Sequence, residues 1–135
     1  MSPDLELQGA LVAQLTAFAD LSALIDDRVY DDPEDDAAYP YVTIGESQFL
    51  NDDMTCRRAW RVYLTLHAWS RKTGYPEVKQ VASAVADALH LASLPMAHFR
   101  VAIITHSQTR VFRDADGATS HAVITFDARV EEIPA

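Results

Sequence analysis

Histidine side chains are the first candidates for chemistry in this sequence, because they can bind metals or move protons. The five histidines are His67, His90, His98, His106 and His121. No two of them have the spacing of four residues that places a pair of zinc ligands on one face of a helix. His106 and His121 fall on two strands that a turn joins, but folding about that turn leaves them a few places out of opposition. We therefore interpret the histidines as surface or structural residues and expect no metal site.

The sequence also lacks the usual arrangements for nucleophilic or acid–base catalysis. The serines nearest to histidines along the chain are Ser70, Ser107 and Ser120, and none lies in a G-x-S-x-G motif. No glycine-rich phosphate-binding motif is present, and Glu46, Glu77 and Asp87 are isolated from other acids, so no pair suggests acid–base chemistry. We expect no catalytic residue and no cofactor.

Residues 114–117 read DADG and have a superficial likeness to a calcium-binding loop. An EF-hand loop needs glycine at its sixth position and glutamate at its twelfth. Here the glycine is fourth and the twelfth position is Thr125. The segment is instead typical of a hairpin turn, in which Gly117 supplies the positive φ angle.

The 135 residues are enough for one domain, which we assign to residues 1–135. The single cysteine, Cys56, excludes an intrachain disulfide and a cysteine-based zinc site, and we interpret it as a reduced thiol. No apolar run is long enough to cross a bilayer, and the first residues lack the basic segment of a secretory signal. We therefore expect no membrane association.

The charge is unevenly distributed along the chain. Residues 1–56 carry thirteen acids and one arginine, whereas the remainder carries ten basic and seven acidic residues, for a net charge of −9. An acidic chain repels phosphate backbones, so we expect no specific binding of nucleic acid. Two interpretations of the asymmetry remain open: the acids keep the protein soluble, or acid meets base where copies stack head to tail.

The periodicity of the apolar residues predicts an α+β fold. Helices are expected at residues 3–18 and 76–91, with a short helical turn at 20–25 and a short strand at 28–30. The long strands are expected at residues 41–49, 59–69, 100–113 and 118–131. The order α-β-β-α-β-β predicts a mostly antiparallel four-stranded sheet with two main helices packed on one face.

The strand at residues 59–69 alternates clearly between two faces. One face is apolar: Trp60, Val62, Leu64, Leu66 and Ala68. The other is mixed: Arg61, Tyr63, Thr65, His67 and Trp69. We expect the first face to lie on the helices and the second to be open or covered by another subunit.

Two acidic segments and one basic segment are candidates for contacts between subunits. The acidic candidates are Asp31, Asp32, Asp35 and Asp36 in one loop and Asp52 and Asp53 in the next; the basic ones are Arg57, Arg58 and Arg61. These arginines could complement the acids within the chain or across a subunit boundary, and the first acidic loop could equally be solvated. Trp69 is the aromatic candidate, with packing inside the same chain as the alternative.

Several short motifs, taken in order, resemble one protein family. They are LSALIDDRVY at residues 21–30, YPYVTIGE at 39–46, HAWS at 67–70 before a helix, RDADG at 113–117, and the strand at 121–126. Their order and spacing resemble the tail-completion proteins of long-tailed phages, which include the tail terminators of gene transfer agents. The acidic insert at residues 31–36 departs from that pattern.

The resemblance implies a structural virion protein without catalytic residues. It implies a tail terminator that forms a ring, commonly a hexamer, on the tail tube protein and joins it to the head connector or stopper protein, with DNA passing through the lumen unbound. The protein would be made in the bacterial cytoplasm and sit at the head-proximal end of the tail. A head-side connector, either adaptor or stopper, is the alternative within the class. A small-molecule-binding regulatory α+β module and, third, a hydrolase are the alternatives outside it.

Overall fold

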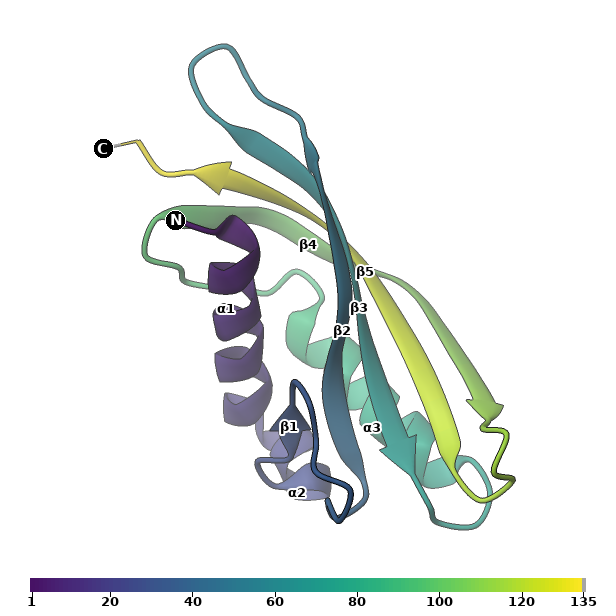
Figure 1. Cartoon of the computed structure of the whole chain (residues 1–135). Helices are drawn as coiled ribbons and strands as arrows, with labels where there is room; N and C mark the ends of the chain where they lie inside the picture. Colours follow the sequence, from purple (N-terminus) through teal and green to yellow (C-terminus); the bar gives the residue numbers. More distant parts are fainter. Residues whose placement is uncertain (135) are drawn as a thin grey trace.

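The structure is a computed structural model that describes residues 1–134 of the chain. Within these residues the elements are α1 (Pro3–Ala17), α2 (Ala19–Ile25), β1 (Val29–Tyr30), β2 (Tyr41–Asn51), β3 (Ala59–Ser70), α3 (Pro76–Leu89), β4 (Phe99–Arg113) and β5 (Ser120–Glu132). The strands form one sheet in the order β1-β2-β3-β5-β4, and the helices cover one of its faces (Figure 1).

The predicted α+β class is confirmed, but the sheet has five strands and three helices lie on it. The added strand, β1, pairs parallel to β2 at Val29↔Val42 and Tyr30↔Thr43. This is the short strand expected at residues 28–30, but two residues are too few to show an alternating pattern, so its place in the sheet was not predicted. The short helical turn expected at residues 20–25 is α2, which is separated from α1 by a bend of 81° at Phe18, where the backbone leaves the helical conformation.

The first helix begins as its sequence predicts. The Ser2 hydroxyl accepts a hydrogen bond from the backbone N–H of Leu5 at 3.1 Å, and Pro3 occupies the first helical position. Leu7, Leu11 and Leu15 are buried against the sheet. The sequence had placed the end of α3 at residue 91, but α3 ends at Leu89.

The core lies between the helices and one face of the sheet. On β3 it takes every second side chain, and the register partners on β5 do the same. The alanines of α3, including Ala82, Ala84 and Ala88, are also buried, so this thin helix packs close to the strands. The apolar stripes predicted from the sequence are therefore the ones that face the core.

The predicted hairpin joins β4 to β5, with the last strand starting at Ser120 and not at residue 118. Gly117 has a φ of 72°, as its place in the turn requires. The Asp116 carboxylate accepts hydrogen bonds from the Thr119 hydroxyl and from the backbone N–H groups of Ala118 and Thr119, which lower its pKa to about 2. These side-chain contacts hold residues 118 and 119 in the turn, so β5 begins later than predicted, at Ser120.

In the described part of the chain, no single helix is long and apolar enough to cross a membrane. Only α1 and α2 together would meet that criterion, as a sharply bent pair, and their leucines belong to the core.

Candidate assembly surfaces

A row of aromatic side chains crosses the helix-free face of the sheet. Its members are register partners in successive strands: Tyr41 of β2, Trp69 of β3, His121 of β5 and Phe112 of β4. The ring centroids are 6.4 Å apart for Tyr41–Trp69, 3.8 Å for Trp69–His121 and 4.8 Å for His121–Phe112. The Trp69 indole N–H donates to the Thr43 hydroxyl at 3.1 Å. We call these four residues the aromatic row; they pack on one another within the chain, with Tyr41 and His121 buried and Trp69 and Phe112 partly exposed.

Two histidines and one carboxylate form a hydrogen-bonded chain beside this row. The Asp114 carboxylate lies 3.2 Å from Nδ1 of His121, and Nε2 of His121 lies 2.7 Å from Nδ1 of His67. Because an ionised carboxylate only accepts, His121 donates through Nδ1 and accepts through Nε2, and His67 donates through Nδ1. This assignment leaves Nε2 of His67 as the free acceptor at the end of the chain.

The two histidines are held neutral by their surroundings. Burial lowers the pKa of His67, and the charge that His121 could carry lowers it further. Burial also lowers the pKa of His121, against the opposing effect of Asp114. Gly45 makes the arrangement possible, since a Cβ at that position would lie 2.6 Å from the Thr65 carbonyl oxygen and 2.8 Å from Nε2 of His67. Gly45 sits where a β-bulge interrupts the register of β2 with β3.

A charge cluster occupies the opposite end of the same sheet face. Its centre is the Glu131 carboxylate, which is only 6% exposed and accepts from Arg57 at 3.3 Å, from Arg129 at 3.4 Å and from Arg100. Arg129 also binds Asp52 at 2.6 Å. The hydrogen bond from Arg100 is the main cause that lowers the pKa of Glu131; burial opposes it, and Arg129 and Arg57 add to the lowering. These five residues are called the charge cluster below.

The cluster contains two of the interface candidates from the sequence, Asp52 and Arg57, and the structure places three others beside it. The Asp53 carboxylate accepts from the backbone N–H of Ala59 at 3.1 Å. Arg58 lies over the ring of Trp60 at 5.0 Å, and Arg61 is exposed on the helix-free face. All of them lie where β2 ends and β3 begins, around the hairpin that projects from the sheet (Figure 1).

The first acidic segment lies elsewhere, in the loop between β1 and β2. We call residues 31–36 the acidic loop. Its acids are Asp31, Asp32, Glu34, Asp35 and Asp36, all exposed, and none forms an ion pair within residues 1–134. A shallow hollow lined partly by Tyr30 opens on this loop. The hairpin arginines therefore do not complement the acidic loop within the chain, because the two sit at opposite ends of β2.

The hydrogen-bonded chain of Asp114, His121 and His67, and the central role of Glu131 in the charge cluster, were not predicted from the sequence. His67, His121, Arg129 and Glu131 each fall on the side of a strand that the alternation assigns to the helix-free face. That signal was available, but β3 and β5 are far apart along the chain. Only the strand order makes them neighbours, with His67 next to Val123 and Trp69 next to His121.

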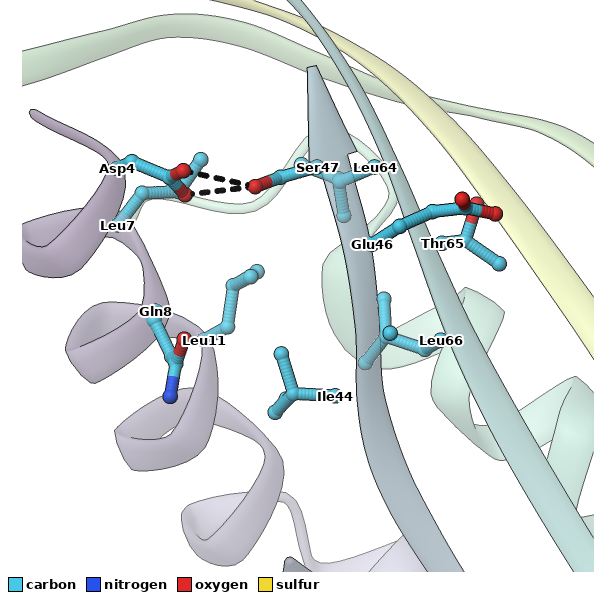
Figure 2. Close-up of a pocket in the computed structure, with 11 residues that line it drawn as sticks. Asp4, Leu7, Gln8, Leu11, Ile44, Glu46, Ser47, Leu64, Thr65 and Leu66 are labelled. Atoms are coloured by element: carbon cyan, nitrogen blue, oxygen red, sulfur yellow. Dashed lines mark hydrogen bonds between the residues drawn. The ribbon is translucent and has the colours of Figure 1, made fainter. Parts of the chain in front are cut away.

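A narrow crevice lies between α1 and β2 and is lined by both polar and apolar side chains (Figure 2). The Asp4 carboxylate accepts the Ser47 hydroxyl at 2.8 Å across it, and Leu11 and Ile44 line its floor. Its free volume is about 20 Å³, far below that of a ligand pocket. The alternative of a small-molecule-binding module gains no support from this crevice. Within residues 1–134, no cluster of three histidine, cysteine or carboxylate side chains could hold a metal ion.

Comparison with known proteins agrees with the resemblance in the motifs. The family model described as tail completion protein gp17 matches residues 9–131. The tail completion protein gp17 of Bacillus phage SPP1 is 27% identical over 118 residues, which are 87% of each chain. A chain in the virion of a native gene transfer agent particle superposes with a TM-score of 0.88, at 27% identity, over 95% of this chain and 96% of its own. The solved SPP1 gp17 protein superposes with a TM-score of 0.57, at 25% identity, over 96% and 90%.

Proposed function

Because the chain belongs to the tail completion protein gp17 family of virion structural proteins, we propose that it is a tail terminator of a phage or gene transfer agent particle. In this role, copies of the chain form a ring that caps the tail tube and joins it to the head connector. The ring is a hexamer, its partners are the tail tube protein and the connector or stopper, and DNA passes through its lumen.

One observation carries the proposal most strongly. The chain matches a component of a gene transfer agent virion from end to end, at 95% coverage and a TM-score of 0.88. A match of this extent leaves only 5% of the chain outside the superposed region. A protein that shared only part of the fold would not match over nearly the whole length of both chains.

The surface chemistry fits a role in assembly. The helix-free sheet face carries an aromatic row at one end and a charge cluster at the other, both suited to contacts with protein. The acidic loop has no partner inside the described chain, and it repels phosphate if it faces the lumen. Function on this proposal rests on contact surfaces, with Asp52, Asp53, Arg57, Arg58, Arg61 and Trp69 among them, and involves no catalytic group.

The position of the protein in the particle is the decisive test. We would label the C-terminus and image particles by cryo-electron microscopy, together with particles from cells that lack the protein. A terminator predicts label between tail tube and head, and tails of uncontrolled length in its absence. Heads that lose their DNA while tails keep their length would instead identify a head-side connector.

A second test addresses the acidic loop. Replacing Asp31, Asp32, Asp35 and Asp36 with lysine should impair assembly of the ring or passage of DNA, because the reversed charges attract phosphate and repel basic neighbours. The measurements are particle titre and tail length. Wild-type values for both would contradict a role of this loop in the ring.

A further inference from the structure

The two lateral edges of the sheet carry opposite, unused charge at the same end. One edge holds β1 and the acidic loop; the other is β4, where Arg110 and Arg113 are exposed near its end. Arg110 lies over the ring of Phe112 at 5.4 Å and Arg113 over Tyr75 at 5.1 Å, and neither forms an ion pair within residues 1–134. Both edges therefore keep their charge available for an external partner.

The β4 edge is closed in its first half and open in its second. In the first half, the segment after α3 binds the strand: the Leu91 N–H donates to the Ile104 carbonyl at 2.7 Å, and the His106 N–H donates to Nδ1 of His90 at 3.0 Å. From residue 108 to 113 no such contact is found in the described chain, and residues 107–110 are all exposed. We call residues 108–113 the basic edge. An open edge strand of this kind is a site for another chain unless it is covered.

The acidic loop and the basic edge also lie at matching heights along the strands. The aromatic row runs in register from Tyr41 to Phe112, so it connects one edge to the other without a shift. Tyr30, which lines the hollow of the acidic loop, packs edge to face on Tyr41 with ring centroids 5.6 Å apart, and Arg110 lies over Phe112 at the far end. A neighbour related by a rotation with little rise would thus bring one charge opposite the other.

From these observations we propose that the basic edge of one copy docks against the acidic loop of the next copy. This inference rests on the proposed function and specifies its subunit contact. The contact joins two different surfaces, so it repeats head to tail, and the matched heights favour closure into a ring over an open filament. The arginines meet carboxylates with which they form charge-assisted hydrogen bonds, and the acids gain the partners they lack within the chain.

Cysteine crosslinking in intact particles tests this contact. In a background with Cys56→Ser, Ala38→Cys lies just after the acidic loop and Ala115→Cys just after the basic edge, and both alanines are exposed and uncharged. The pair should give a ladder of crosslinked multimers with a short bismaleimide, whereas each single variant should give none. The matched control pairs Ala38→Cys with Ala97→Cys, which lies at the closed end of β4 and should give no ladder.

Two results would overturn the inference. Particles that contain the protein but yield no ladder from the 38/115 pair would exclude the contact, and a dimer from a single cysteine variant would indicate a symmetric contact instead. Absence of the protein from the particles would contradict the proposed function itself, so the two failures are distinguishable.

Exchanging the charges of the basic edge and the acidic loop is an independent test of the proposed contact. Arg110→Glu with Arg113→Glu, or Asp35→Arg with Asp36→Arg, should each lower particle titre by roughly tenfold or more, because like charges then face each other. The four substitutions combined restore the original net charge and an attractive contact, and should recover most of the titre. Equal loss in the combined variant would contradict a direct contact between the two edges.

Discussion

The two ends of the helix-free sheet face stabilise their polar side chains in different ways. Both hold polar groups against a partly buried strand surface. At one end, a single chain of hydrogen bonds joins the Asp114 carboxylate to the neutral rings of His121 and His67, next to the stacked ring of Trp69. At the other end Glu131 is surrounded by three arginines. At the first end, the free energy of unfolding should therefore depend on pH and on the size of the side chains packed around the histidines. At the second end, it should depend on the charge of Glu131 and on salt concentration.

The largest effect is expected at the aromatic end, from Gly45→Ala. The added Cβ would collide with the Thr65 carbonyl oxygen and with Nε2 of His67, so the bulge and the His67 ring must shift. We expect a loss of about 1–3 kcal/mol in the free energy of unfolding, measured by urea denaturation.

The matched control is Gly9→Ala on α1, where a Cβ meets nothing within 4 Å. It should be neutral or stabilise by up to ~1 kcal/mol, because alanine is the better helix former. Equal behaviour of the two variants would remove the steric account of Gly45.

At the charged end, Glu131→Gln should lower the free energy of unfolding by about 1–2 kcal/mol, because three arginines lose their shared carboxylate. The arginines are partly exposed, which limits the cost. The difference from wild type should shrink at high salt, where the arginines are screened from one another. Asp127→Asn is the control on the same strand face, since Asp127 is exposed and forms no ion pair in the described chain; a similar loss there would argue against a special role of Glu131.

Between pH 5 and 8, the pH response should come mainly from the aromatic end, because the lowered carboxyl pKa values of Glu131 and Asp116 act at more acidic pH. Burial lowers the pKa of His67 and His121 in the folded state, so the unfolded chain binds protons more readily. Stability is then complete above the ordinary value of 6.5 and falls as the pH drops below it. The loss at pH 5.5 is at most about 1.4 kcal/mol for each histidine, and less where the ring edge reaches water.

Replacing His67 with glutamine should flatten this dependence. The readout is the free energy of unfolding measured at several pH values from 5 to 8. If the variant keeps the wild-type slope, the pH response comes from other groups and the contrast between the two ends does not hold.

The smallest effect on stability is expected in the acidic loop. Asp35→Asn with Asp36→Asn removes charges that have no partner within residues 1–134, so the free energy of unfolding should change by less than ~0.5 kcal/mol. Relief of repulsion among the acids could make the change slightly favourable. A large destabilisation in urea would mean that these acids support the fold of the single chain and would weaken their assignment to assembly.

Much of the fold could be predicted from local pattern. The cap at Ser2, the apolar stripe of α3, the two faces of β3 and the turn at Gly117 each depend on neighbours in the sequence. The short elements β1 and α2 were expected at nearly their observed positions, but β1 was not counted in the sheet and α2 was not counted among the helices packed on it. Some ends set by side-chain contacts were also missed, as at Ser120. The motifs also indicated the family, which the comparisons confirm.

The candidate site was predicted less completely. The sequence indicated exposed acids in the acidic loop, arginines at the start of β3 and Trp69 on the helix-free face, and the structure places them accordingly. Their use in assembly stays a prediction. The hydrogen-bonded histidines and the Glu131 hub could not be predicted, since each joins side chains from strands that are distant in sequence.

By itself, the sequence determined the α+β class, the composition of each sheet face and the division of charge between the two parts of the chain. Those features follow from periodicity and composition, which are local. The tertiary structure alone decided that β5 lies between β3 and β4 and that Gly45 makes room for His67. It also placed the acidic loop and the basic edge at the two opposite lateral edges of one sheet. The order of strands depends on contacts between residues that are distant in sequence and on the packing of the whole core. A local sequence pattern therefore does not determine it.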